Sequence, residues 1–270
     1  MASARPRALT IAGSDSGGGA GVQADLKAFQ ANGCYGLTVL AALTAQNTLG
    51  VQAIHDVPPE FVAAQLDSVL ADIGADAAKT GMLSRPEVIE VVAERLRRFG
   101  VRNLVVDPVM VSKSGHRLLR PEAVDALRRR LLPLAELATP NLEEVADLVG
   151  QRPANEAEML EAAKAVRALG PRAVLVKGGH LGPEAPHSND VLWDGVAATV
   201  LPGRRLAAVH THGTGCTLSA SIAAQLAHGR PLAEAVANAK RYLEGAMERA
   251  WPLGGGIGPV DHAWNLSGFA

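Results

Sequence analysis

The stretch Ala8-Leu-Thr-Ile-Ala-Gly-Ser-Asp-Ser-Gly-Gly-Gly-Ala-Gly21 decides the fold that we expect for this chain. Its first residues, up to Gly13, are mainly apolar and predict a buried strand, and a glycine-rich loop follows. Apolar residues then recur at helical spacing from Val22 to Phe29. A strand, a glycine loop and a helix in this order are typical of a ligand loop at the carboxyl edge of a parallel sheet.

Strand and helix patterns alternate along the rest of the chain. Strands are expected at 34–43, 76–82, 101–107, 137–139 and 173–177, helices at 58–72, 86–96, 121–132, 156–169, 213–228 and 231–251, and a further helix after Pro140. Residues 44–48 are expected to form a polar loop, and 191–193 with 197–201 an antiparallel ribbon. The alternation predicts one α/β domain over residues 1–270, with 1–7 flexible. The domain would be a three-layer α/β/α sandwich with a mainly parallel central sheet.

Several of the expected strands end on glycine or on a polar residue. These residues are Gly13, Lys79, Asp107, Thr139 and Lys177. Because ligands of open α/β sheets bind outside the carboxyl ends of the strands, we expect these residues to converge at one site.

Composition excludes several classes of function. Aromatic residues make up only 3% of the chain and the net charge is −1, which argues against a nucleic-acid partner and against an anionic membrane surface. No apolar run is long enough to span a bilayer, and the start of the chain lacks the hydrophobic core of a secretion signal. Two cysteines, Cys34 and Cys216, cannot form a disulfide framework, and Cys34 is expected to be a packed residue. We therefore expect a soluble cytoplasmic protein.

A second glycine turn, His210-Thr-His-Gly-Thr-Gly-Cys-Thr-Leu-Ser-Ala220, precedes an alanine-rich helix pattern. Such a helix start presents free backbone N–H groups and the positive end of the helix dipole, which suit an anion. Cys216 would sit where a thiol loses its proton most easily. The alternatives are a tight packing corner and a buried structural thiol.

Two common nucleotide motifs are missing. The sequence has no Gly-Lys-Ser/Thr and therefore no P-loop. Residue 22 is Val where a dinucleotide fingerprint would need its third glycine, which argues against a hydride-transferring Rossmann enzyme.

The motifs that are present resemble those of the hydroxymethylpyrimidine and phosphomethylpyrimidine kinases of thiamine biosynthesis, in the ribokinase-like superfamily. The resemblance runs from about residue 8 to Gly258-Pro-Val-Asp-His262. Its motifs are Ile11-Ala-Gly-Ser-Asp-Ser-Gly-Gly-Gly-Ala-Gly-Val-Gln-Ala-Asp25, Thr44-Ala-Gln-Asn-Thr48, Lys79-Thr-Gly-Met82, Asp107-Pro-Val-Met110, Thr139-Pro-Asn-Leu-Glu-Glu144, Lys177-Gly-Gly-His180 and His212-Gly-Thr-Gly-Cys-Thr217. A ribokinase-like fold agrees with the sandwich expected from the alternating patterns.

The resemblance implies a catalytic role for the second glycine turn. Gly213, Thr214 and Gly215 would form an anion hole for the transferring γ-phosphoryl group. Cys216 would accept the proton of the substrate's hydroxymethyl group, with its pKa lowered by the helix start and nearby cations.

For the pyrimidine, the resemblance implies that Gln46 faces the ring. Its carboxamide matches a ring nitrogen and the adjacent exocyclic amine, an edge that the substrate of related pyridoxal kinases lacks. An apolar slot would be completed by Gly13, Ala20, Met82 and Val109. Asp25 would contact the ligand or a water, or alternatively interact with the helix dipole.

For the nucleotide, Asn141 and Glu144 resemble the superfamily's Mg²⁺ and phosphate element, and Asp107 would hold the metal through water. Lys177 and Thr211 would meet phosphates. Lys113 is a weaker candidate for the same task. Two histidines, His210 and His212, are expected to be loop scaffolding rather than zinc ligands.

The activity implied is ATP- and Mg²⁺-dependent phosphorylation of 4-amino-5-hydroxymethyl-2-methylpyrimidine to its monophosphate, and of the monophosphate to the diphosphate. A pyridoxal or pyridoxine kinase on the same fold is the alternative, and a non-catalytic nucleotide or vitamin sensor is a third account. The resemblance implies a homodimer and leaves open whether a monovalent cation assists.

Overall fold

The computed structural model describes residues 5–111, 119–179, 181, 187–206 and 209–266. Within these residues a nine-stranded sheet has the order β3-β2-β1-β4-β5-β6-β7-β8-β9. The strands are β1 (Arg7–Asp15), β2 (Tyr35–Asn47), β3 (Gly50–Asp56), β4 (Ala77–Thr80), β5 (Leu104–Val106), β6 (Leu137–Ala138), β7 (Ala173–Val176), β8 (Asp190–Trp193) and β9 (Ala198–Leu201). The six central strands, β2-β1-β4-β5-β6-β7, pair in parallel, and β3, β8 and β9 add antiparallel edges.

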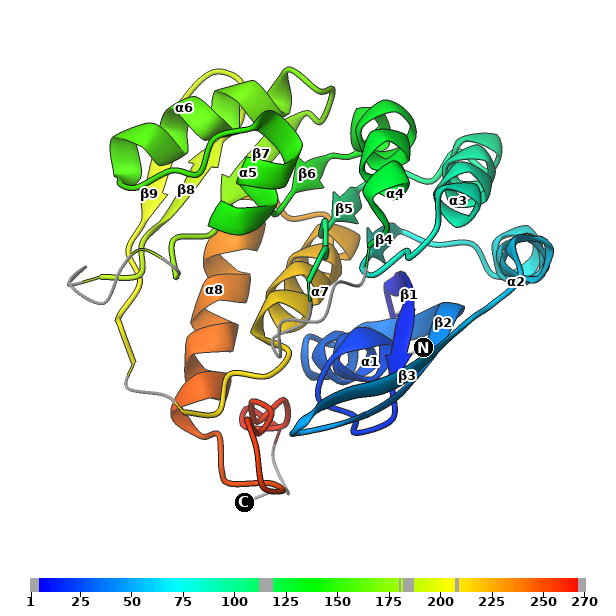
Figure 1. The fold of residues 1–270 in the computed structure, drawn as a ribbon, viewed down its shortest axis with the longest axis horizontal. Coiled ribbons are helices and arrows are strands. Elements are labelled where there is room, and N and C mark those ends of the chain that lie inside the picture. Colours follow the sequence, from blue (N-terminus) through cyan, green and yellow to red (C-terminus); the bar gives the residue numbers. More distant parts are fainter. Residues whose placement is uncertain (1–4, 112–118, 180, 182–186, 207–208, 267–270) are drawn as a thin grey trace.

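Helices cover both faces of this sheet (Figure 1). One face carries α1 (Gly21–Ala31), α7 (Thr214–Ala227) and α8 (Leu232–Glu248). The other carries α2 (Pro59–Asp72), α3 (Pro86–Arg98), α4 (Pro121–Ala126), α5 (Leu142–Val149) and α6 (Glu156–Arg167), with a π-helical turn η1 (Leu127–Leu131) and a 3₁₀ turn η2 (Leu132–Leu134) after α4. The predicted three-layer sandwich with a mainly parallel sheet is therefore confirmed.

The layers follow from the alternation of side chains along each strand. In β5, Leu104 and Val106 pack into the core under α2 to α6, whereas Val105 packs into the core under α1, α7 and α8. Successive strand residues point to opposite faces of a sheet, so a run of apolar residues supplies both cores at once.

Two local predictions are corrected by the structure. Residues 44–48 are not simply a polar loop, because β2 continues to Asn47 and pairs with β3. Their polar side chains are compatible with a strand because this hairpin lies at the sheet edge, half open to water. The helix expected to run to residue 132 is α-helical only to Ala126.

Other predictions stand. The ribbon of β8 and β9 is antiparallel, and Cys34 is a buried packed residue, 1% exposed. Burial raises the pKa of the Cys34 thiol to about 11. None of the helices in the described part of the chain combines the length and the apolar character that a bilayer crossing requires.

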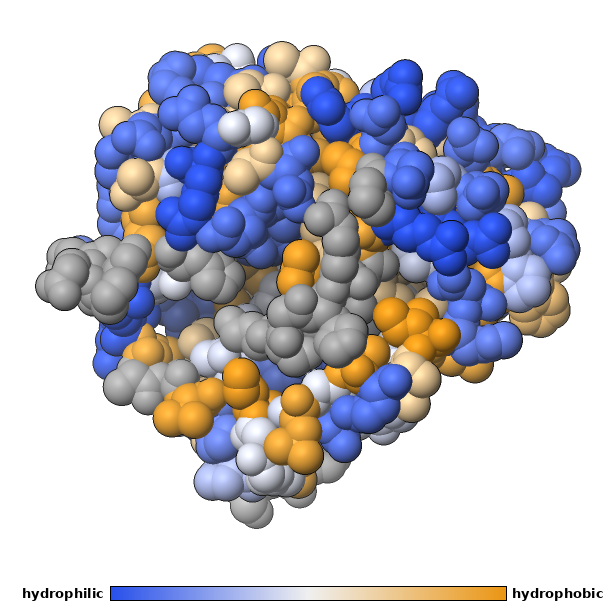
Figure 2. Space-filling view, in the orientation of Figure 1, coloured by the Kyte–Doolittle hydropathy of each residue, from blue (hydrophilic) through white to orange (hydrophobic). Residues whose placement is uncertain are grey.

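The face shown in Figure 2 is largely hydrophilic over α3 and the helices beside it. Hydrophobic residues gather on its lower part, where Figure 1 places the β2–β3 hairpin and the segment after α8. Exposed large apolar side chains of these parts include Leu43, Leu49, Ile54, Trp251 and Leu253.

Candidate functional site

The start of α7 requires glycine at its first corner. Gly213 has a φ of 79°, and a Cβ there would lie 1.8 Å from the carbonyl oxygen of Gly19. Among the described residues no side chain caps this helix, so the turn over 213–216 offers backbone N–H groups to an anion. The two glycine-rich loops of the sequence, 16–21 and 213–215, therefore touch each other.

The largely buried ammonium group of Lys177 lies beside this turn. A Cβ on Gly215 would lie 3.6 Å from Lys177 Nζ and 3.7 Å from Asp107 Oδ2. Lys177 follows β7 and Asp107 follows β5, so the carboxyl ends of these strands and the start of α7 meet at one place, as predicted. Helix N–H groups and an ammonium group together can hold a highly charged phosphate.

The carboxylate of Asp107 is held from three sides. Lys177 Nζ donates to its Oδ1 at 2.9 Å, Thr139 Oγ1 donates to the same oxygen at 3.2 Å, and Ser219 Oγ donates to Oδ2 at 3.1 Å. Burial alone would raise the pKa of Asp107, but Lys177 and Lys79 outweigh it and hold the pKa below its ordinary value. Asp107 is therefore an anion that orients Lys177.

Glu144 adds a second carboxyl group to the same cluster. Its Oε2 lies 3.6 Å from Lys177 Nζ and accepts a hydrogen bond from the backbone of Asn141 at 2.7 Å. Burial raises the pKa of Glu144 to about 7, Lys177 opposes the rise, and Asp107 adds to it. One lysine thus faces two carboxyl groups.

Two carboxyl groups beside one lysine can accommodate a divalent cation. The described residues contain no group of three His, Cys, Asp or Glu side chains arranged for a metal. Mg²⁺, however, usually keeps several waters and takes one or two carboxylates together with substrate phosphates, and Asp107 with Glu144 can supply this.

Asn141 has a task that the sequence analysis did not foresee. Its Oδ1 accepts from the backbone N–H groups of Glu143 and Glu144, and Glu144 reciprocates, which makes a capping box at the start of α5. Asn-Leu-Glu-Glu is a recognisable capping sequence. The predicted phosphate residue and the predicted metal residue are therefore fixed to each other by helix capping.

Cys216 departs from its predicted chemistry. It lies half-buried in the first turn of α7, where we expected a lowered pKa. Instead, burial raises the pKa of the Cys216 thiol to about 11; Lys79 opposes this, while the charges of Asp25 and Asp107 favour it. Desolvation and the two buried carboxylates outweigh Lys79 and the backbone hydrogen bond from Gly21.

The structure uses Asp25 differently from the predicted ligand contact or helix-dipole role. Asp25 is fully buried in α1, beyond its first turn, and both of its oxygens accept from Lys79 Nζ at 2.9 and 2.8 Å. Thr10 also donates to it, at 2.5 Å. The attraction of Asp25, Cys216 and Asp107 outweighs the burial of Lys79 and raises the pKa of this lysine. Lys79 comes from β4, so this pairing is invisible in the local sequence.

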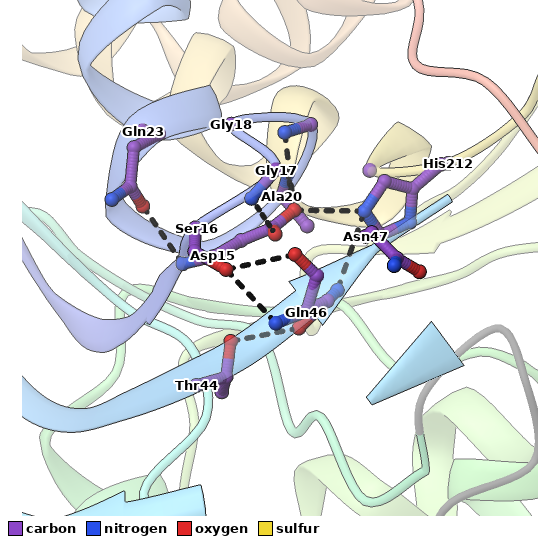
Figure 3. Close-up of polar contacts among 12 residues, drawn as sticks. Asp15, Ser16, Gly17, Gly18, Ala20, Gln23, Thr44, Gln46, Asn47 and His212 are labelled. Atoms are coloured by element: carbon purple, nitrogen blue, oxygen red, sulfur yellow. Dashed lines mark hydrogen bonds and ion pairs between the residues drawn. The ribbon is translucent and has the colours of Figure 1, made fainter. Parts of the chain in front are cut away.

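Sequence reasoning also missed the centre of the first glycine loop (Figure 3). Asp15 Oδ1 accepts from Gly17 N at 2.8 Å, and Oδ2 accepts from Gly19 N and Ala20 N at 3.1 and 2.8 Å. His212 Nε2 lies 2.8 Å from the same Oδ2. Burial would raise the pKa of Asp15, but His212 and the loop N–H groups outweigh it and lower the pKa. A lone aspartate within a glycine run was the available signal.

Gln46 lies on β2 beside this network (Figure 3). Its Oε1 accepts from Thr44 Oγ1 at 3.1 Å, and its Nε2 is 3.4 Å from His212 Nε2. The carboxamide is half-buried, so it remains within reach of a ligand. His212 is thus scaffolding, as predicted, and it joins Gln46 to Asp15.

The remaining predicted residues surround these groups. Met82 packs on Gly13, where a Cβ would lie 2.5 Å from Met82 Cε, and Val109 is half-buried after β5. Thr211 accepts through its carbonyl oxygen from Thr214 Oγ1 at 3.2 Å. Lys113 and His180 lie outside the described residues.

Comparison with known proteins gives a consistent result. A family model described as phosphomethylpyrimidine kinase matches residues 15–261. A hydroxymethylpyrimidine/phosphomethylpyrimidine kinase of Rhizobium meliloti is 56% identical over 259 residues, which cover 94% of this chain and 96% of the relative.

Two solved structures share the fold. The ADP complex of Bacillus subtilis pyridoxal kinase is 41% identical with a TM-score of 0.89, over 96% of this chain and 98% of that one. A phosphomethylpyrimidine kinase of Clostridium difficile 630 is 43% identical with a TM-score of 0.79, over 88% of this chain and 98% of that one. The expected ribokinase-like fold is therefore confirmed.

Proposed function

This chain belongs to the phosphomethylpyrimidine kinase family, and we propose that it uses ATP to phosphorylate 4-amino-5-hydroxymethyl-2-methylpyrimidine to its monophosphate and the monophosphate to the diphosphate, in thiamine biosynthesis. One observation supports this most strongly. The Gly213–Cys216 turn, with its backbone N–H groups, lies next to Lys177 and Asp107 at the carboxyl edge of the sheet: a Cβ on Gly215 would be 3.6 Å from Lys177 Nζ and 3.7 Å from Asp107 Oδ2. Backbone N–H groups beside a lysine suit a phosphoryl group that is being transferred.

In the proposed reaction the hydroxymethyl oxygen attacks the γ-phosphorus of ATP, the bond to the bridging oxygen breaks, and ADP leaves with that electron pair. The transition state is loose, so catalysis is mainly positioning and charge stabilisation. Lys177 and the N–H groups of 213–216 would hold the equatorial oxygens, with Asp107 fixing the lysine. Thr211 and Asn141 would complete the phosphate site.

Mg²⁺ would neutralise charge that develops on the phosphates. Asp107 and Glu144 would hold it, in part through water, because these two carboxyl groups face a single lysine, Lys177. With Glu144→Gln we expect the thermal stabilisation by ADP to lose most of its dependence on added Mg²⁺. An unchanged dependence would place the metal elsewhere.

Cys216 would receive the alcohol's proton. With a pKa of about 11 only a small fraction of the sulfur is thiolate at neutral pH, but that fraction is strongly basic. In a loose transition state the proton leaves late, when the new P–O bond has already acidified it.

Gln46 would read the pyrimidine edge, and Gly13, Ala20, Met82 and Val109 would enclose the ring. A pyridoxal kinase is the second candidate, because a pyridoxal kinase is among the similar structures. Steady-state assays of the pyrimidine alcohol, its monophosphate and pyridoxal at fixed ATP separate the two. We expect the pyrimidines to be preferred, and Gln46→Met to lower kcat/KM for them more than for pyridoxal. Preference for pyridoxal would overturn the proposal.

We also propose that one domain in the cytoplasm carries this reaction and that it works as a homodimer. The proposed residues all lie on one sheet edge and the loops above it, and exposed apolar side chains such as Leu43 and Ile54 on the edge hairpin suit a subunit contact. Light scattering of the protein should give twice the chain mass of 28.0 kDa; a monomer at micromolar concentration would contradict it.

A further inference from the structure

The segment Gly254–His262, which follows α8, runs back across the site and is called here the C-terminal strap. At its start it is bound to the turn of the β2–β3 hairpin. Gly256 N donates to Thr48 Oγ1 at 3.2 Å, and Ile257 N donates to Thr48 O at 3.0 Å. Thr48 lies two residues after Gln46, so the strap is fastened beside the proposed pyrimidine-reading residue.

The middle of the strap is bound to the loop before α7. His212 N donates to Gly258 O at 3.0 Å, and Gly258 N donates to His210 Nδ1 at 3.1 Å. Pro259 pairs with His212 as an isolated parallel bridge. A Cβ on Gly19 would lie 3.0 Å from Pro259 Cβ, so the strap also closes against the first glycine loop.

The end of the strap reaches the anion-binding turn through one side chain. His262 is buried, and its Nε2 lies 2.9 Å from Thr217 Oγ1. Thr217 Oγ1 in turn lies 2.8 Å from Gly213 O, and Thr217 N donates to that same oxygen at 2.8 Å. The carbonyl of His262 is fixed by Tyr242, whose hydroxyl donates to it at 2.7 Å.

Two observations define the hydrogen bond between His262 and Thr217. Thr217 is fully buried in the first turns of α7, so its hydroxyl has few other partners to choose from. Burial lowers the pKa of His262 to about 4, so the ring is neutral at physiological pH. A hydroxyl has one hydrogen, which Thr217 donates to Gly213 O, so the link requires the tautomer in which Nε2–H donates to Thr217 Oγ1. The ring and the hydroxyl therefore form a fixed link from the strap to the backbone of Gly213.

We infer that His262 is a positioning residue for phosphoryl transfer: through Thr217 it holds the Gly213–Cys216 turn in the shape that receives the transferring phosphate. The inference rests on the proposed function, because it assigns the phosphate to this turn. His262 touches no reacting atom. Its effect is on where the N–H groups of the turn point, and misplacement of such groups by a fraction of an ångström lowers transition-state stabilisation.

The test compares His262→Leu, Thr217→Val and the double variant with the wild-type enzyme. Each single change should lower kcat about 10- to 100-fold and leave the KM values for ATP and for the pyrimidine alcohol within about threefold, since the turn is engaged most strongly in the transition state. The double variant should be no slower than the slower single variant, because both changes remove the same link. His262→Gln, whose side-chain amide can place an N–H donor near the position of Nε2, should restore part of kcat.

His228→Leu is the matched control. His228 lies at the other end of α7, with its Nε2 2.9 Å from Asn32 O, and it has no part in the site. Its kcat should remain that of the wild type. If His262→Leu folds poorly, Thr217→Val still tests the same link.

A second readout does not depend on the substrate. In the enzyme without ligands, His262→Leu should speed amide hydrogen exchange in a peptide covering 210–220 and leave a peptide from the middle of α8 unchanged. If wild-type enzyme ignores the pyrimidine alcohol but this exchange changes as expected, the proposed function fails and the structural link stands. Unchanged exchange, or a wild-type kcat in Thr217→Val, would overturn the inference.

Discussion

At Cys216, two influences that sequence reasoning treats as one act in opposite directions. Burial and the carboxylates of Asp25 and Asp107 favour the thiol, whereas Lys79 and the backbone N–H of Gly21 favour the thiolate. The thiol wins because desolvation disfavours a charge regardless of its sign, and both carboxylates repel a second anion. The position of the residue was predictable, but its ionisation was not.

The pH dependence of Cys216 follows from this balance. A thiolate required for activity, with a pKa of about 11, means that kcat/KM should rise about tenfold per pH unit between pH 7 and 9 and show no plateau. Iodoacetamide labelling of Cys216, followed by peptide mass spectrometry, should rise in parallel. Cys216→Ala should lose about 10²- to 10⁴-fold in kcat.

A plateau of labelling by pH 8 would contradict the raised pKa. Full turnover in Cys216→Ala would remove this residue from the reaction altogether. Cys34 provides an internal reference for labelling, because it is 1% exposed and its pKa is also raised.

The pair of Asp25 and Lys79 allows a second prediction at this scale. Asp25→Asn leaves the Lys79 ammonium buried with no full counter-charge, which should reduce the free energy of unfolding by about 3–5 kcal/mol. Replacing both residues, as Asp25→Leu with Lys79→Met, should restore most of that stability. Urea unfolding measures each change.

The exposed pair of Arg7 and Asp76 is the control for this comparison. Its side chains are 41% and 36% exposed, so Asp76→Asn should change the free energy of unfolding by no more than about 1 kcal/mol. Equal losses in Asp25→Asn and Asp76→Asn would show that burial of the first pair has no energetic consequence.

At the scale of elements, the beginning of α7 is fixed by a contact between two loops. Gly213 is required both for its positive φ and for the approach of the Gly19 carbonyl. Capping chooses the start of α5 in another way, since Asn141 and Glu144 satisfy each other's backbone N–H groups. The N-termini of α5 and α7 face the same edge of the sheet, so the positive ends of their helix dipoles act on the same place.

Gly213→Ala and Gly229→Ala separate these two requirements. Both glycines have a positive φ, 79° and 76°, but a Cβ on Gly229 would meet no described atom within 4 Å. Gly229→Ala should therefore reduce the free energy of unfolding by about 1–2 kcal/mol, from backbone strain alone. Gly213→Ala should lose at least about 3 kcal/mol, because overpacking adds to that strain.

Chemical denaturation checks both values, and nucleotide binding to Gly213→Ala gives a second measurement. Similar losses in the two variants would mean that the Gly19 loop moves away without resistance. The two loops would then not form a single rigid site.

At the scale of the whole molecule, His262 joins the C-terminal strap to the sheet layers and makes stability depend on pH. Its ring is neutral when folded because burial, with the charge of Lys27, lowers its pKa from 6.5 to about 4. The unfolded chain therefore binds more protons between these two values, so stability falls as the pH drops below 6.5.

The difference in unfolding free energy between the wild type and His262→Gln isolates this effect. It should be constant above pH 7 and fall by about 2 kcal/mol between pH 6.5 and 5, at 1.36 kcal/mol per pH unit. Glu144 titrates in the same range with the opposite sign, because its pKa is raised to about 7, but it contributes equally to both proteins and cancels. A difference that does not change with pH would mean that the ring is charged in the fold.

Sequence patterns were enough to predict the class of the fold, the order of most elements and the residues that end the strands. These properties follow from hydrophobic patterns that repeat every two to four residues, so short stretches of the sequence contain them. The motifs also led to the prediction that Cys216, Lys177 and Glu144 act in the site.

The charge of these groups and the contacts that hold them depend on the three-dimensional arrangement of the chain. It joined Asp15 to His212 across 197 residues and Asp25 to Lys79 across 54, it made residues 44–47 part of a paired strand, and it raised the pKa of Cys216. Burial and pairing depend on which distant segments meet, and the free energy of a charge depends on all of its neighbours in space. No short window of the chain contains that information.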